Sequence, residues 1–175
     1  METPASIARH PLHPMLITIP VGLWVFSLVC DIVVLFSDVG EVELVWFMLA
    51  YYTMAGGLVG ALIAAVPGLF DFFSLRNRRL RKLALTHMAI NLSVVALYAV
   101  NLWLRSAEPP VFLAGMGLSV LGVVLIAISG WIGGEMVHVH GIGVAAVPAP
   151  VDDVTDREAT HTGPSATRLG PTAGS

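Results

Sequence analysis

Four long apolar runs constrain the fold of this chain more than any other feature of its sequence. They cover residues 15–36, 46–70, 83–103 and 111–132. Each has the roughly 20-residue length that an α-helix needs to cross a hydrocarbon layer about 30 Å thick. Because a backbone in lipid must satisfy its own hydrogen bonds, such runs form helices. With 12% charged residues and a mean hydropathy of +0.81, the chain is predicted to be all-α, an integral membrane four-helix bundle.

The segments before and after these runs differ from them in composition. Residues 1–14 are predicted to form an N-terminal interfacial segment ahead of a transmembrane domain of residues 15–143. No small-residue cleavage site follows the first run, which favours a retained helix over a signal peptide. A helix that begins as late as Pro20 would leave the preceding histidines along the membrane interface. Residues 144–175 are rich in Ala, Pro, Thr, Gly and Asp, and they are predicted to be a disordered tail.

One basic segment, residues 76–82, determines the predicted topology. It holds five of the nine Lys and Arg residues and lies between the second and third runs. Positive side chains beside a span resist translocation, so this loop is predicted to be cytoplasmic. With four crossings, both termini are then cytoplasmic as well. The remaining cations are too few for a nucleic-acid interface, and the single Cys30 excludes an intrachain disulfide, a CxxCH haem attachment and a multi-cysteine metal site.

Several polar residues lie within the apolar runs. On a helix, His87, Asn91, Tyr98 and Asn101 fall within an arc of about 80°. Intramembrane polar groups avoid lipid, so this face is predicted to point into the bundle. For Tyr98 and Asn101 the alternatives are interhelical hydrogen bonding and a proton or electron path. Asp31 lies in the first run with no intramembrane Lys or Arg predicted to pair it, so we expect a neutral carboxylic acid with either a proton-linked role or a plain hydrogen bond.

A second group of polar residues is predicted to share the cytoplasmic ends of the helices. Its seven members are His10, His13, Asp71, His87, Glu135, His138 and His140. A b-type haem needs two histidines from different helices. His87 could provide one, and the second could be His10, His13, His138 or His140. A transition-metal site would use His10, His13, His87 and Glu135. The alternative is a structural or proton-handling network. A di-iron centre is not expected, because it needs two Glu-x-x-His pairs and the chain has only Glu135 with His138.

Small residues recur at close-packing intervals in the second and fourth runs. The pairs are Gly56 with Gly60, Gly115 with Ser119, and Gly130 with Gly134. Each pair is typical of helices whose backbones approach closely in a membrane. Gly133 and Gly134 are also predicted to mark the end of the fourth helix.

The polar motifs together resemble an uncharacterised bacterial membrane-protein family, domain of unknown function 2231. The resemblance covers residues 10–144. The motifs that carry it are His10-Pro-Leu-His13-Pro, Pro20-x-Gly22, Asp31, Pro67-Gly68-x-x-Asp71, His87-x-x-x-Asn91 and Gly133-Gly134-Glu135-Met-Val-His138-x-His140-Gly141-x-Gly143. Where this chain has His138, the family more often has an aromatic residue such as tyrosine. This shifts the predicted cofactor ligands to His10, His13, His87 and His140, with Asp71, Asn91, Glu135 and His138 supporting them.

The resemblance implies a location in the bacterial inner membrane and an association with electron transfer, because some similar four-helix modules are joined to Rieske-type or c-type cytochrome domains. Here such a partner would be a separate polypeptide, and a homo-oligomer is a further possibility. The first hypothesis is therefore a redox-associated membrane module without catalytic activity of its own. The alternatives are a non-catalytic anchor or scaffold subunit and a small proton-linked transporter that uses Asp31 and the polar face with His87.

Overall fold

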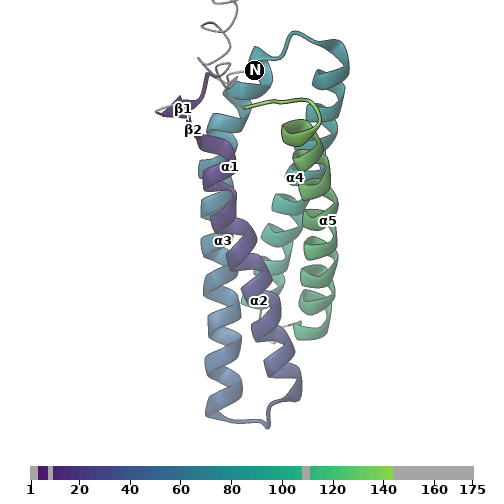
Figure 1. The fold of residues 1–175 in the computed structure, drawn as a ribbon. Coiled ribbons are helices and arrows are strands. Elements are labelled where there is room, and N and C mark those ends of the chain that lie inside the picture. Colours follow the sequence, from purple (N-terminus) through teal and green to yellow (C-terminus); the bar gives the residue numbers. More distant parts are fainter. Residues whose placement is uncertain (1–3, 8–9, 108–110, 144–175) are drawn as a thin grey trace, which may run out of the picture. The chain divides into compact units, whose positions relative to one another are not determined.

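The computed structural model describes residues 4–7, 10–107 and 111–143, and its elements are labelled in Figure 1. Their order is β1 (Ser6–Ile7), β2 (His10–Pro11), α1 (Leu12–Leu16), α2 (Thr18–Phe36), α3 (Glu41–Ser74), α4 (Arg78–Ser106) and α5 (Phe112–His138). The predicted disordered tail, with its cytoplasmic location, lies outside the described residues. So do residues 1–3 and 8–9 of the predicted interfacial segment.

The described residues confirm the all-α class and the four predicted spans. Four helical stretches are long and apolar enough to cross a membrane: Leu12–Phe36, which combines α1 and α2, and then α3, α4 and α5. The only strands in the described part of the chain are β1 and β2, a short antiparallel pair in which Ile7 lies opposite His10. This pair precedes α1 and leaves the helical class unchanged.

The helices extend beyond the apolar runs that predicted them. The first begins at Leu12, three residues before the predicted run and well before Pro20, so His13 lies inside a helix. The basic segment also differs from a loop, because Arg78 begins α4. The side chain of Asn77 caps that helix by accepting hydrogen bonds from the backbone N–H groups of Arg79 and Leu80.

The fourth helix differs from its prediction in the same way. It continues to His138, so Gly133 and Gly134 are helical residues and do not mark its end. Of the predicted glycine pairs, Gly130 and Gly134 have open space around them, since a Cβ added at either would meet nothing within 4 Å. That pair therefore makes no close helix contact in this structure.

Two helical hairpins, α2 with α3 and α4 with α5, pack against each other within residues 1–145 (Figure 1). Their centre is a stack of Trp24 from α2 on Tyr98 from α4, with ring centroids 4.3 Å apart and planes 6° apart. Glycines allow this approach. A Cβ at Gly122 would lie 2.7 Å from a ring carbon of Tyr98, and one at Gly57 would collide with the indole of Trp24.

Polar and apolar residues are distributed as a lipid environment requires. Trp131 is 80% exposed, and Phe73 and Leu113 are also on the surface. By contrast, Asp31 and Arg105 have exposed fractions of 0% and 2%. A water-soluble protein rarely buries charges fully while it exposes so many large apolar side chains, whereas in a membrane the charges must turn inward.

Candidate functional site

Two of the predicted ligands, His13 on α1 and His87 on α4, lie next to each other. Their ring centroids are 6.4 Å apart and their planes are nearly perpendicular, at 88°. Both side chains are half-buried. We call these two residues the histidine pair. It brings together the two helical hairpins at the end of the bundle that carries α1.

Each ring of the histidine pair is held by a backbone carbonyl. The Nδ1 atom of His13 lies 2.8 Å from the carbonyl oxygen of Ala64, and the Nδ1 atom of His87 lies 3.0 Å from that of Ser129. A carbonyl only accepts hydrogen bonds, so Nδ1 carries the proton in both rings. In the neutral form of each imidazole, Nε2 then presents a lone pair.

The Nε2 atom of His87 already has a partner. It accepts a hydrogen bond of 2.9 Å from the side-chain amide of Asn91, one turn further along α4. The hydroxyl of Ser129 in turn donates to the amide oxygen of Asn91 over 3.1 Å. His87, Asn91 and Ser129 thus form a closed network between α4 and α5, and the ring of His13 lies beside that of His87.

Glycines fit the histidine pair into the bundle. A Cβ at Gly68 would lie 2.7 Å from Nδ1 of His13, and a Cβ at Gly133 would lie 3.2 Å from Cε1 of His87. Gly68 of the Pro-Gly motif and Gly133 of the Gly-Gly motif therefore each leave room for an imidazole from a neighbouring helix.

Of the other predicted ligands, Asp71 and His140 make hydrogen bonds with backbone groups. Asp71 accepts a hydrogen bond of 3.1 Å from the backbone N–H of Ala5. Nδ1 of His140 donates to the carbonyl oxygen of Glu135 over 3.2 Å. The side chains of His10, Glu135, His138 and His140 are exposed. In the described ranges no group of three or more His, Cys, Asp or Glu side chains is placed to hold a metal ion, so the predicted four-ligand set is not assembled.

A second polar site lies further along the bundle, where Asp31 of α2 meets Arg105 of α4. Two guanidinium nitrogens of Arg105 each lie 2.6 Å from a carboxylate oxygen of Asp31, and both side chains are fully buried. This is a bidentate ion pair, the strongest geometry available to these groups. The expectation of an unpaired, neutral Asp31 is therefore wrong. It failed because α4 continues past residue 103 and includes Arg105.

Two neutral side chains complete the surroundings of the ion pair. The Nε of Arg105 donates to the side-chain oxygen of Asn101 over 3.0 Å, and the amide of Asn101 donates to the hydroxyl of Ser119 over 2.9 Å. We call Asp31, Asn101, Arg105 and Ser119 the ion-pair cluster. Tyr98 lies beside it, with its hydroxyl 3.4 Å from the carbonyl oxygen of Ser119.

Three residues of these sites were missed in the sequence, although a signal for each was present. Arg105 follows His87 by about five helical turns, so it lies on the predicted polar face. Ser119 and Ser129 share one face of α5 with the glycines opposite Tyr98 and His87. A stripe of small residues that includes hydroxyls indicates where bulky polar groups of the facing helix fit.

The whole of both sites falls within one family match. The family described as predicted membrane protein DUF2231 matches residues 9–146. The chain belongs to this family. No curated protein and no solved structure matches it.

Membership of DUF2231 agrees with the resemblance found in the motifs and with the membrane character of the helices. The match includes the histidine pair, the ion-pair cluster and the turn that ends α5. The two sites are therefore parts of one DUF2231 domain.

Proposed function

We propose that this DUF2231 protein is a redox-associated membrane module in which His13 and His87 bind a b-type haem or a transition-metal ion. The observation that carries the proposal is the geometry of the histidine pair. Two imidazoles from different helices lie 6.4 Å apart, and each is anchored through Nδ1 on a carbonyl oxygen. Metal-binding histidines are usually held in this way, because the second hydrogen bond fixes the ring and directs the other nitrogen to the metal.

The separation of the rings suits a shared metal. Metal–nitrogen bonds of about 2.0–2.1 Å bring two ligand nitrogens to within about 4 Å of each other. Rings whose centroids are 6.4 Å apart lie within the range of such an arrangement. At His87, a metal held by Nε2 would take the place of the hydrogen bond from Asn91.

Further groups at this end of the bundle support the site. A Cβ at Gly143 would lie 3.5 Å from the side chain of Pro11, so the turn after α5 passes close to the strand that carries His10. In this proposal His10, His140 and Glu135 are the additional ligands for an ion, with Asp71 and His138 outside them. If a haem is bound, the basic first turns of α4 would supply cations for its propionates.

The test is an absorption spectrum and a metal analysis of the protein purified in mild detergent. We expect a Soret band or one equivalent of a transition metal, lost in both His13→Ala and His87→Ala. His138→Ala is the matched control, because that histidine is exposed at the same end of the bundle and should leave the signal unchanged. A colourless, metal-free and folded wild-type protein would contradict the proposal.

One observation favours a second function, a non-catalytic anchor or scaffold subunit. The side chains of His87, Asn91 and Ser129 already satisfy one another. Such a network is sufficient to join α4 to α5 without binding any ligand. In that case His87→Ala lowers the stability of the protein, and neither haem nor metal accompanies the wild type.

The proposal includes an orientation and a partner. The basic residues at the start of α4 support a cytoplasmic location for that end of the bundle, for both termini and for the tail, in a bacterial inner membrane. The electron-transfer partner is a separate Rieske-type or cytochrome protein. Reporter fusions after Lys82 and after Ser175 should both be active only as cytoplasmic reporters, and a periplasmic signal from either would reverse the orientation.

A further inference from the structure

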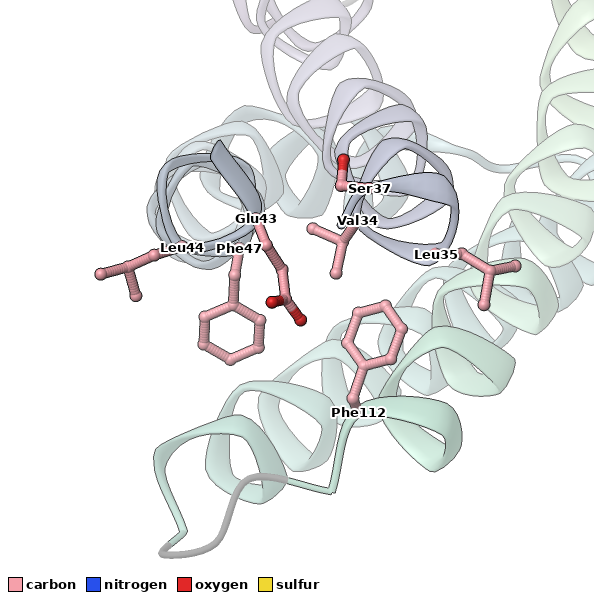
Figure 2. Close-up of a pocket in the computed structure, with 7 residues that line it drawn as sticks. All are labelled: Val34, Leu35, Ser37, Glu43, Leu44, Phe47 and Phe112. Atoms are coloured by element: carbon pink, nitrogen blue, oxygen red, sulfur yellow. The ribbon is translucent and has the colours of Figure 1, made fainter. Parts of the chain in front are cut away.

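A groove lies at the end of the bundle opposite the histidine pair. It has a volume of about 540 Å³ and runs between the end of α2, the first turns of α3 and the start of α5 (Figure 2). This volume falls in the range of small-molecule sites, about 300–1,000 Å³. The groove is lined by Val34, Leu35, Ser37, Glu43, Leu44, Phe47 and Phe112.

The lining combines one carboxylate with two aromatic rings. Figure 2 shows the carboxylate of Glu43 reaching into the groove between the side chains of Phe47 and Phe112. The two phenyl rings have centroids 6.5 Å apart and planes 49° apart. Among the described residues that line the groove, Glu43 is the only ionisable one. A carboxylate attracts a cation by its charge, and a cation that lies over a ring face is attracted by the quadrupole of that ring as well.

We propose that this groove binds the head group of a phospholipid that carries a primary ammonium, an ethanolamine phospholipid of the surrounding bilayer. The groove lies at the ends of membrane-spanning helices, which is the depth of lipid head groups. Leu35 and Leu44 at its margin are 47% and 60% exposed, and they continue the apolar surface along which acyl chains lie.

The charges around the groove favour this head group over an anionic one. Glu41 and Glu43 both lie in the first turn of α3. The cation of the ion-pair cluster, Arg105, lies behind Phe112 at 6.0 Å from its ring centroid, and Asp31 neutralises it. The net side-chain charge of these described residues is therefore negative, which disfavours the phosphoglycerol head group of an anionic lipid.

Hydrogen bonding separates ethanolamine from choline. A primary ammonium donates hydrogen bonds to a carboxylate, whereas a quaternary ammonium has no N–H group to donate. A charge-assisted hydrogen bond to Glu43 should make the ethanolamine lipid bind about tenfold more tightly than a choline lipid of the same acyl chains.

The experiment is native mass spectrometry of the full-length protein in detergent, titrated with ethanolamine, choline and glycerol phospholipids of identical acyl chains. We expect the ethanolamine lipid to bind about tenfold more tightly than the other two. Glu43→Gln should remove this preference. Glu41→Gln is the matched control, an exposed acid of the same helical turn outside the groove lining, and it should retain the preference for the ethanolamine lipid over the choline lipid.

A second variant separates a loss of lipid binding from a folding defect. Phe47→Leu keeps Glu43 and shortens one wall, so it should weaken ethanolamine-lipid binding while the melting temperature of the protein stays close to that of the wild type. Equal binding of all three lipids to the wild type would overturn the proposal, because it would indicate annular lipid only. So would an undiminished preference in Glu43→Gln. Neither result bears on the histidine pair, which lies at the other end.

Discussion

The histidine pair and the ion-pair cluster differ in how their polar groups are paired inside the bundle. Both place polar groups inside an apolar bundle. In the ion-pair cluster, Asp31 and Arg105 are fully buried and both oxygens of the carboxylate are used by the guanidinium. In the histidine pair, His13 and His87 are half-buried, and His13 keeps a nitrogen beyond its carbonyl contact. The charged groups of the ion-pair cluster are therefore fully paired with each other, whereas the histidine pair contains a ring nitrogen outside these contacts.

The two sites are separated along α4 by apolar and aromatic contacts. Val94 lies between Asn91 and Tyr98, and Tyr98 is stacked on Trp24. Asn91 and Tyr98 are about 10 Å apart along the helix axis. The aromatic stack therefore stands between the clusters, and this arrangement favours separate roles over one continuous polar path.

The largest expected effect comes from breaking the ion pair on one side. Arg105→Met leaves Asp31 as an uncompensated buried carboxylate, which should cost about 3–5 kcal/mol of folding free energy. Denaturation of the purified protein by heat or by SDS measures the loss. If the two ends are distinct, any haem or metal bound at His13 and His87 is retained in the protein that stays folded.

A double variant sharpens this test. Asp31→Leu with Arg105→Met replaces both charges by apolar groups, so the double variant should be more stable than either single variant. Losses that simply add would show that the two charges are not coupled, against the 2.6 Å contacts of the structure.

The second largest effect should come from the aromatic stack that separates the sites. Gly122→Ala places a Cβ 2.7 Å from the ring of Tyr98. The strain on the Trp24–Tyr98 stack should cost about 1–3 kcal/mol, measured by the same denaturation. Gly117→Ala in the same helix is the control, because its Cβ meets nothing within 4 Å. An equal loss in both variants would mean that the contact with Tyr98 is not the cause.

The sequence predicts the helices of this bundle better than their ends. Apolar runs mark the part of a helix that lies in hydrocarbon, but the helix itself continues into the interface, where charged residues are tolerated. This is why the predicted third run ends at residue 103, before Arg105, and why no partner is predicted for Asp31. The polar face of α4 was visible in the sequence, and one further turn would have included the arginine.

The histidine pair shows a different limit. Spacing places seven polar residues at one end of the bundle, but it does not fix how each helix is rotated. The first apolar run starts at residue 15, so the sequence alone does not assign His13 to a helical face. Its start at Leu12 is what directs His13 toward Gly68 and His87. Glycines opposite histidines were the available signal, since each imidazole lies over one.

The smallest expected effect separates the two interpretations of the histidine end. Asn91→Ala removes the hydrogen bond to Nε2 of His87 and the acceptor for Ser129. Interhelical hydrogen bonds in membranes contribute on average about 0.6 kcal/mol, so the stability loss should be well below that of Arg105→Met.

Removal of the Asn91 amide also frees the Nε2 atom of His87. In a ligand site, Asn91→Ala should therefore bind haem or metal at least as tightly as the wild type in a spectroscopic titration. In a purely structural network the variant is slightly less stable and gains no ligand. Loss of a wild-type spectral signal in Asn91→Ala would instead mean that the amide positions His87 for its ligand.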